Sequence, residues 1–367
     1  MNNLERLWRE HRQSPWVDFV DRPFIESGRL ERLIDRGIRG LTSNPTIFAK
    51  AIAGGAYDEL ISRRIDEGAT DEQIFEEIAV HDVGEAADRL RRVHDSADGH
   101  DGFASIEVEP ALAHDTQATT ERARHLWRRL ERPNVMIKIP ATPAGLPAIS
   151  TAIAEGINVN VTLVFSIEMY ERVAHAYIEG LRQRQADGQD VTRVASVASF
   201  FVSRVDTNVD ARLDGLATPA AGALRGQAAI ANARLAYESF ERIFDGPDFA
   251  DLRAAGARVQ RCLWASTSTK DPAYRDVLYV EELIGPETVD TMPPDTIEAL
   301  IDHGRVAPTL TGQAAPAREV FDRLASLGIS MAEVTDELLR EGVEKFAASF
   351  DELIATIADK RKVLAGG

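Results

Sequence analysis

Short apolar or alternating segments recur along the chain, and segments with helical spacing separate them. The segments that we predict to be β-strands are 16–20, 38–43, 103–109, 134–140, 157–164, 194–202, 258–266 and 288–292. Parallel strands need long crossover connections, usually helices, and eight strands are what a closed barrel of this kind requires. The pattern therefore predicts an α/β fold, a (β/α)8 TIM barrel.

Helical periodicity is clearest near the end of the chain. An apolar stripe there runs through Val343, Phe346, Phe350, Leu353 and Ile357. This is the spacing of one helix face. Basic residues 360–362 follow in the final turns and Gly366–Gly367 come after them, as expected at a helix C-terminus. No repeat or clear linker divides the chain, so we predict one barrel domain over residues 1–367 with additional helices, including a C-terminal helical extension.

A lysine interrupts the fourth predicted strand. On a strand, successive side chains point to opposite faces, so Val135, Ile137 and Ile139 share one face while Met136 and Lys138 share the other. A buried ammonium is costly unless it is paired or loses its proton, and the neutral amine of a lysine is the form that attacks a carbonyl. From this segment alone two interpretations stay open: an edge lysine that reaches water, and a lysine that forms a Schiff base.

Three further predicted strands carry polar side chains on the face opposite their apolar neighbours. These side chains are Asp18, Glu107, Asn160 and Thr162. In the fifth strand, for example, alternation places Val161 and Leu163 on the face opposite Asn160 and Thr162. A half-solvated antiparallel strand would alternate in the same way. In a barrel, however, one face meets the helices and the other meets the interior, where polar residues converge.

Asn44, at the end of the second predicted strand, joins this group. It precedes Pro45, which disfavours helical backbone for the residue before it and so suits a strand that turns into a loop. Taken alone, Asn-Pro is also ordinary turn punctuation. Enzymes on such barrels place their sites at the C-terminal ends of the strands, so we expect the polar side chains to meet there. A lysine with two carboxylates within reach can form an imine and move protons around it.

Composition points to a soluble globular protein of a reducing compartment. The apolar fraction is 44% and the charged fraction 28%, as in soluble domains. The N-terminus lacks an apolar signal core, and the uncharged stretch near 194–203 is far shorter than the roughly 20 residues of a membrane helix. The single cysteine, Cys262, excludes an internal disulfide and is expected to be a core thiol. We therefore expect a cytoplasmic protein with no membrane partner.

The formal net charge of −17 argues against nucleic-acid partners and anionic membranes. It also means that an anionic substrate must be held by a local cluster of cations. The eight histidines form no HExxH motif and one cysteine cannot build a thiolate metal site. There is no G-x-G-x-x-G or Walker loop, so we expect neither a metal nor a nucleotide cofactor.

Five segments, taken in order, resemble the signature segments of transaldolases. They are Leu41–Thr46, Ser105–Glu109, Val135–Thr142 with Gly145, Gly156–Ser166 and Val197–Asp206. The likeness runs from about residue 14 to about residue 357, and the ordered set is far more specific than any one segment. The resemblance, to the long bacterial type, implies a class I aldolase-type (β/α)8 barrel that uses no cofactor and acts in the pentose phosphate pathway.

The resemblance also implies catalytic roles on this chain. Lys138 would form a Schiff base with the C2 carbonyl of a ketose phosphate. Asp18 would take the proton of the C4 hydroxyl, so that the C3–C4 bond breaks and an aldose phosphate leaves. Glu107 and Thr162 would position a water that relays protons while the imine forms and hydrolyses.

Binding residues follow from the same resemblance. Those for the retained dihydroxyacetone unit are Asn44, Asn160 and Ser199. Arg204, which we expect beyond the regular strand, matches the phosphate-binding arginine of the family, and its planar guanidinium suits a phosphate. Many relatives have a second arginine in an Ala-Ser-x-Arg pattern, but here Ser268 stands at that place and Lys270 follows. We expect Lys270 to supply the second charge; the alternative is a solvated surface lysine.

The implied function is that of a transaldolase. Such an enzyme transfers dihydroxyacetone from sedoheptulose 7-phosphate or fructose 6-phosphate to glyceraldehyde 3-phosphate or erythrose 4-phosphate. The alternatives are a lyase of the fructose 6-phosphate aldolase type, which releases free dihydroxyacetone, and a catalytically silent sugar-phosphate-binding protein. Glu107 favours the transferase because the smaller aldolase relatives lack a glutamate there, and the complete set of polar residues argues against silence. The preferred substrates and a homo-oligomeric state stay open.

Overall fold

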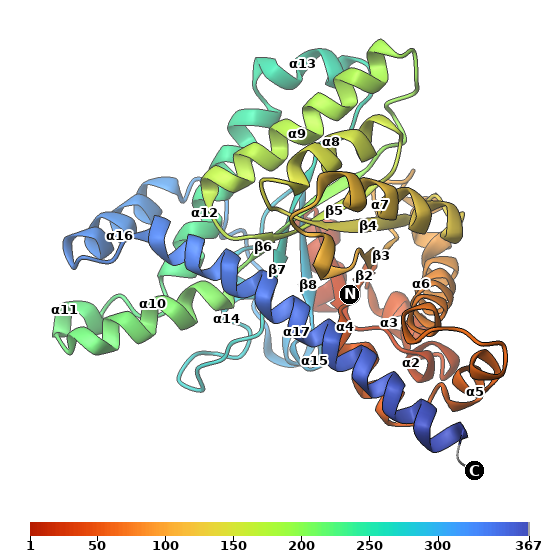
Figure 1. Cartoon of the computed structure of the whole chain (residues 1–367). Helices are drawn as coiled ribbons and strands as arrows, with labels where there is room; N and C mark the ends of the chain where they lie inside the picture. Colours follow the sequence, from red (N-terminus) through yellow and green to blue (C-terminus); the bar gives the residue numbers. More distant parts are fainter. Residues whose placement is uncertain (366–367) are drawn as a thin grey trace.

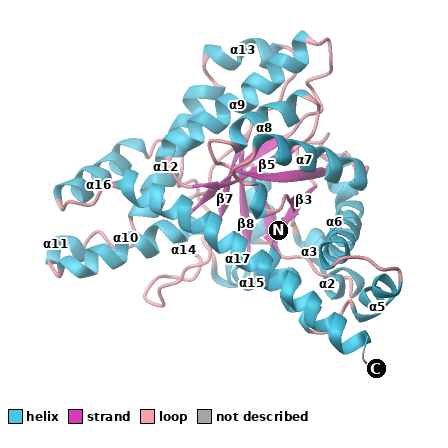
Figure 2. Ribbon diagram, in the orientation of Figure 1, coloured by secondary structure: helices cyan, strands magenta, loops and turns pink. Residues whose placement is uncertain are grey.

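The computed structural model describes residues 1–365 and confirms the predicted barrel. Eight parallel strands close into a barrel in the order of the sequence, and Figure 2 shows them at the centre of a ring of helices. The strands are β1 (Gln13–Asp18), β2 (Gly40–Thr42), β3 (Phe103–Glu107), β4 (Val135–Pro140), β5 (Val159–Val164), β6 (Ser196–Phe201), β7 (Arg261–Ala265) and β8 (Thr288–Met292).

The largest boundary error concerns β1, which was predicted at 16–20 and lies at Gln13–Asp18. Gln13 is polar but fully buried, and its side-chain amide donates to the Leu283 carbonyl at 2.6 Å. The same nitrogen also donates to the Thr288 hydroxyl at 3.0 Å, and these two bonds hold a polar residue at the start of an interior strand. The strand stops at Asp18 because the chain turns toward the next helix, which Asp21 caps by accepting from the backbone N–H of Phe24 at 2.8 Å.

A bulge in β5 corrects the predicted alternation of that strand. The register against β6 shifts between Val161 and Val164, and Leu163 has φ +60°, which is the left-handed region. Leu163 therefore does not continue the outward face of Val159 and Val161; it lines the cavity at the mouth of the barrel. Bulges commonly redirect side chains beside functional sites.

The two faces of the strands separate two layers of the core. Apolar outward side chains such as Val135, Ile137 and Ile139 pack against the surrounding helices. Inward side chains near the strand starts form a separate cluster that includes Trp16, Phe103, Met136, Val197, Leu263 and Val289. This inner cluster fills the middle of the barrel and separates the C-terminal ends of the strands from a buried polar group at their N-terminal ends, in which the Arg261 guanidinium donates to the Ser14 hydroxyl at 2.8 Å.

The helices cover the barrel on all sides (Figure 2). They are α1 (Asn3–His11), α2 (Arg22–Glu26), α3 (Arg29–Arg36), α4 (Pro45–Ala53), α5 (Asp58–Asp66), α6 (Asp71–Ser96), η1 (Pro110–Leu112), α7 (Thr116–Leu130), α8 (Gly145–Ala154), α9 (Ile167–Ala186), α10 (Ser203–Leu216), α11 (Pro219–Gly222), α12 (Ala228–Phe244), α13 (Pro247–Ala254), α14 (Leu278–Glu282), α15 (Pro294–His303), α16 (Ala314–Ser326) and α17 (Met331–Ala365).

The predicted C-terminal helical extension is α17, which crosses the barrel in front of the strands (Figure 1). Leu353 and Ile357 of the predicted apolar stripe are fully buried, and Phe350 packs edge-to-face on Phe75 with ring centroids 5.6 Å apart. The basic residues near its end form ion pairs across the molecule: Lys360 with Asp58 at 2.8 Å and Arg361 with Asp71 at 2.7 Å. The predicted Gly366–Gly367 terminus lies outside the described residues.

Cys262 lies on the outward face of β7 and is fully buried. Burial raises the pKa of its thiol to about 12, so the thiolate that a nucleophile requires is scarce at neutral pH. This agrees with the predicted core thiol. Over residues 1–365, no helix combines the length and the apolar character needed to cross a bilayer.

Candidate active site

A cavity of about 490 Å³ lies at the C-terminal ends of the strands and gathers nearly all of the predicted site residues. Those that line it are Asp18, Asn44, Glu107, Lys138, Thr162, Ser199, Arg204, Ser268 and Lys270. They come from seven strands or strand ends, which is the arrangement expected of a barrel enzyme. Helix α17 closes one side of the cavity with Gly342, Lys345, Phe346 and Ser349.

Lys138 and Glu107 form the centre of the cavity. They are register partners on neighbouring strands, and the Lys138 Nζ atom lies 3.2 Å from the Glu107 Oε2 atom. Lys138 is 8% exposed, and its Nζ atom also donates to the Ser43 carbonyl at 3.1 Å. Burial raises the pKa of Glu107, against the opposing effect of the Lys138 charge. The interpretation of Lys138 as an edge lysine that reaches water is therefore wrong.

Asp18 ends β1 on the other side of the cavity. Its Oδ1 atom accepts a hydrogen bond from the Thr42 hydroxyl at 2.8 Å, and the Thr42 hydroxyl lies 2.9 Å from that of Thr291. Thr42 of the neighbouring strand β2 therefore orients one oxygen of this carboxylate, and Asp18 lines the cavity. Such an oriented carboxylate is suited to act as a base.

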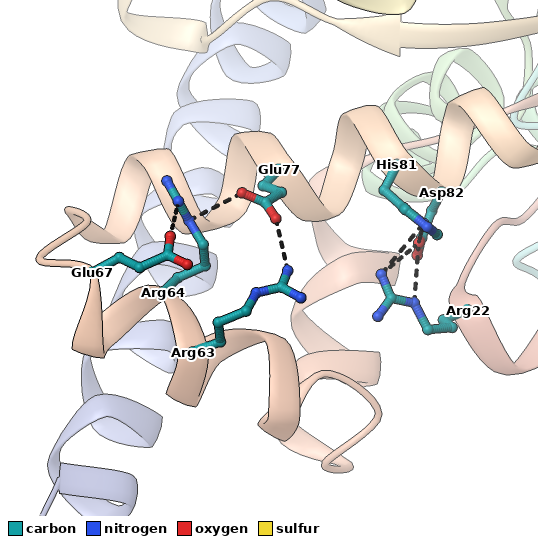
Figure 3. A network of polar contacts seen from close by, with 7 residues as sticks. All are labelled: Arg22, Arg63, Arg64, Glu67, Glu77, His81 and Asp82. Atoms are coloured by element: carbon teal, nitrogen blue, oxygen red, sulfur yellow. Dashed lines mark hydrogen bonds and ion pairs between the residues drawn. The ribbon is translucent and has the colours of Figure 1, made fainter.

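The loop after Asp18 is anchored from outside the barrel by a polar network on α6 (Figure 3). Arg22 forms an ion pair with Asp82 at 3.2 Å, and Asp82 is 1% exposed. The Tyr57 hydroxyl donates to the second Asp82 oxygen at 2.5 Å, and His81 lies 3.1 Å from the first. A buried carboxylate with all these partners is rigid, so the chain directly after the candidate base has a defined position.

A separate group of ion pairs ties α5 to α6. Glu77 pairs with Arg63 and with Arg64, each at 3.0 Å, and Glu67 also contacts Arg64 (Figure 3). These side chains are partly exposed, so each pair contributes little by itself. Their effect is to link the two helices on which the C-terminal half of α17 rests.

Ser199 and Asn160 form a buried pair at the base of the cavity. The Ser199 hydroxyl donates to the Asn160 Oδ1 atom at 2.7 Å, and the Asn160 amide donates to the Ser105 hydroxyl at 3.1 Å. Asn160 is fully buried and lies beneath the residues that line the cavity. The structure thus places Asn160 as a support for Ser199, and its direct contact with a substrate stays a prediction.

Asn44 and Thr162 occupy the wall on either side of the central pair. Asn44 caps α4 by accepting from the Ile47 backbone N–H at 3.2 Å, and it also lines the cavity. It therefore ends the strand segment in a turn and is exposed to the cavity as well. Thr162 is 1% exposed, and the bulge that follows it turns Leu163 into the same space.

Two cations stand together at the rim. Arg204 is the second residue of α10, beyond β6 as predicted, and its guanidinium stacks on Phe201 at 4.8 Å. Burial lowers the pKa of Arg204. Burial, and then the charge of Arg204, lower the pKa of Lys270, whose Nζ atom donates to the Ser268 hydroxyl at 2.6 Å. Two neighbouring cations at the edge of a cavity are suited to bind a multiply charged anion.

Several cavity residues were not identified from the sequence. The Ser43 carbonyl orients Lys138 and the Thr42 hydroxyl orients Asp18. Both lie within the Leu41–Thr46 segment, and the resemblance of that segment to transaldolases was the one signal in the sequence that could have identified them. Phe346 and Lys345 of α17 lie about 300 residues further along the chain. Their helical stripe predicted packing but carried no signal for a place in the site.

A larger cavity, about 870 Å³, lies at the opposite end of the barrel. It contains none of the predicted site residues and is lined by both arginines and carboxylates, many of them paired, such as Arg12 with Glu287 and Arg253 with Asp245. Within residues 1–365, no group of three or more histidine, cysteine, aspartate or glutamate side chains is placed to hold a metal ion. The chemistry therefore concentrates at the C-terminal mouth.

Comparison with known proteins gives a consistent result over nearly the whole chain. The family described as Transaldolase/Fructose-6-phosphate aldolase matches residues 15–357. A transaldolase of Mycolicibacterium smegmatis is 50% identical over 344 residues, 93% of each chain. Transaldolase 1 of Streptomyces coelicolor is 51% identical over 357 residues, 96% of this chain and 93% of the relative. Transaldolase 2 of a Nostoc species is 46% identical over 379 residues, 99% of each chain.

Proposed function

Since the chain belongs to the transaldolase/fructose-6-phosphate aldolase family and has transaldolase activity, that of a transferase, we propose that Lys138 carries the transferred unit as a Schiff base. The observation that carries this proposal is the pair formed by Lys138 and Glu107, 3.2 Å apart inside the barrel. A buried amine beside a carboxylate of raised pKa has an adjacent group that exchanges protons with it. This is the requirement for imine formation.

In the proposed first half-reaction, the neutral Lys138 amine adds to the C2 carbonyl of fructose 6-phosphate or sedoheptulose 7-phosphate. Water leaves the carbinolamine and a protonated imine forms. Glu107 and the Thr162 hydroxyl hold the water through which protons reach and leave this centre. Asp18 takes the proton of the C4 hydroxyl, the C3–C4 bond breaks, and its electron pair moves into the imine to form an enamine. The aldose phosphate leaves.

The second half-reaction reverses these steps on an acceptor. The enamine carbon attacks the aldehyde of glyceraldehyde 3-phosphate or erythrose 4-phosphate, and Asp18 returns its proton to the new hydroxyl. Water then hydrolyses the imine and frees Lys138. No step needs a cofactor, because the protonated imine is itself the electron sink.

We assign binding to the two ends of the cavity. Ser199, supported by Asn160, and Asn44 hold the hydroxyls of the three-carbon unit. Arg204 and Lys270, with the Ser268 hydroxyl, hold the phosphate. The place of Lys270 in the cavity lining with Arg204 supports this role, and because the Lys270 side chain is exposed, the alternative of a solvated surface lysine stays open to test. These sugar phosphates and the single buried thiol fit a reducing cytoplasm.

The test is covalent trapping. Borohydride reduction in the presence of fructose 6-phosphate should add the mass of one reduced dihydroxyacetone unit to the peptide that contains Lys138. Label on another lysine, or none, would contradict the assignment. A coupled assay with and without an aldose phosphate acceptor separates the two activities of the family: turnover should depend on the acceptor, whereas a lyase would release free dihydroxyacetone without one.

A further inference from the structure

One face of α10 carries a row of three acids that the proposed chemistry does not use. Asp206, Asp210 and Asp214 recur at every fourth residue and therefore lie on one side of the helix. Asp206 is 1% exposed and Asp210 is 7% exposed. Buried carboxylates are retained only where they have partners, and in this row most partners come from the segment that connects β7 to α14 and from the turn before α12.

Asp210 holds the β7–α14 segment by a hydrogen bond. The Tyr274 hydroxyl donates to the Asp210 Oδ2 atom at 2.5 Å, and the Gly226 backbone N–H donates to Oδ1 at 3.1 Å. The Tyr274 ring lies against Gly226, which has φ +70° and where an added Cβ atom would stand 3.0 Å from the ring. The ring therefore has little freedom to move.

The neighbouring acids repeat the arrangement. Asp206 accepts from the Tyr279 hydroxyl at 2.9 Å and from the Ala229 backbone N–H at 2.7 Å. Asp214 contacts Arg225, which also contacts Asp271 in the β7–α14 segment. Three successive turns of α10 are thus attached, directly or through Arg225, to this segment or to its continuation in α14.

The two elements joined in this way carry the two cations of the rim. Arg204 is the second residue of α10 and follows Ser203, whose hydroxyl lies 2.8 Å from that of Ser266. Lys270 stands between Ser266 and Tyr274, on a stretch with no regular secondary structure. The segment is therefore attached to α10 on both sides of Lys270, and the separation of the two cations depends on both attachments.

We propose that Tyr274 and Asp210 are positioning residues that set the distance between Arg204 and Lys270, and with it the affinity for the substrate phosphate. This inference rests on the proposed phosphate site. A dianion gains most when both cations are already placed for it, because less ordering then accompanies binding. Loss of the Tyr274–Asp210 bond leaves both charges present but lets the segment that carries Lys270 move.

The test is Tyr274→Phe, which keeps the ring and removes only the donor; Asp210→Asn serves as a second variant. KM for fructose 6-phosphate and the inhibition constant for inorganic phosphate should rise about 3- to 10-fold, the effect of one lost hydrogen bond. The kcat value should stay within about twofold, and KM for unphosphorylated fructose should not change. The matched control is Tyr177→Phe, which breaks a 2.8 Å bond to the Arg258 carbonyl at the other end of the barrel and should change neither constant.

Two outcomes would overturn the inference. One is a wild-type phosphate inhibition constant in both variants. The other is an equal loss on phosphorylated and free sugars, which would indicate a general structural role. The Arg204→Ala and Lys270→Ala variants separate a failure of the positioning role from a failure of the proposed phosphate site. If these two variants weaken phosphate binding and Tyr274→Phe does not, only the positioning role fails. If neither of them weakens it, the phosphate site itself is wrong. In an Arg204→Ala/Lys270→Ala background, the effect of Tyr274→Phe should disappear.

Discussion

The Lys138 Nζ atom and the Glu107 Oε2 atom lie 3.2 Å apart on adjacent strands β4 and β3. The two residues are register partners, so the pairing of the backbones alone brings their side chains to the same height on the inner face of the barrel. Burial raises the pKa of Glu107 while the Lys138 charge opposes this. A carboxyl group of raised pKa beside an amine is the kind of acid or base that the proposed imine chemistry uses.

Replacement of Lys138 by alanine should abolish turnover and leave the fold intact. Among residues 1–365 the polar contacts of this side chain are those to Glu107 and to the Ser43 carbonyl, and the strand pairing of β4 uses the backbone alone. Activity, borohydride trapping and the circular dichroism spectrum should be measured on the variant and on Lys362→Ala, an exposed lysine at the far end of α17. More than a trace of activity in Lys138→Ala would contradict the Schiff-base role.

Glu107→Gln should slow imine formation and hydrolysis by about 10²- to 10⁴-fold, the usual contribution of a positioned acid or base. The basic form of Glu107 is lost as pH falls through its pKa, and because that pKa is raised, the acid limb of the wild-type rate should lie above the ordinary glutamate range near pH 4.3. The variant should lack this limb. Single-turnover trapping across pH measures both effects, and unchanged rates would show that Glu107 is only structural.

Arg204→Ala should lower kcat/KM for phosphorylated donors by about 10- to 100-fold or more at low salt, because a charged hydrogen bond contributes roughly 1.5–3 kcal/mol. Lys270→Ala should act in the same direction if Lys270 replaces the second arginine of the relatives. Both variants should lose little activity on unphosphorylated fructose. If Lys270→Ala affects the two donors equally, its phosphate role is wrong and Arg204 with Ser268 must suffice.

Asp290→Asn should stabilise the protein at alkaline pH. Asp290 is fully buried on the outward face of β8; its Oδ1 atom accepts from Thr267 at 2.9 Å, and its Oδ2 atom has no hydrogen-bond partner among residues 1–365. Burial raises the pKa of Asp290 to about 7, whereas the unfolded chain releases this proton near pH 3.9. The folded state thus binds the proton more tightly, and wild-type stability falls as pH rises between these two values.

An asparagine does not titrate, so the variant should escape this loss. Urea unfolding at pH 8 should show Asp290→Asn more stable than wild type by on the order of 1–4 kcal/mol. The difference should shrink at pH 5 and vanish below pH 4. Equal stability of the two proteins at both pH 8 and pH 5 would show that Asp290 is ionised in the folded state without cost.

Local alternation was sufficient to predict the barrel and the inward polar side chains of β1 and of β3 to β5, whereas Ser199 of β6 was assigned from the resemblance to transaldolases. Lys138 and Glu107 were identified because each interrupts an apolar strand, and a strand has only two faces. The same rule failed at Leu163, where a bulge with φ +60° ends the alternation. It also misplaced the start of β1, because Gln13 reads as a loop residue until its partner, the Leu283 carbonyl, is known.

The sequence by itself determined the fold class, the eight strands and most residues of the cavity, because these depend on periodicity and on ordered motifs within short segments. Only the tertiary structure decided which groups surround these residues. The Ser43 carbonyl accepts a hydrogen bond from Lys138, and the Thr42 hydroxyl donates one to Asp18. Phe346 of α17 lines the cavity, and Tyr274 donates to Asp210. Each of these contacts joins segments that different strands or helices carry. A single bond of this kind leaves no period in the sequence, since its geometry exists only after the barrel has closed.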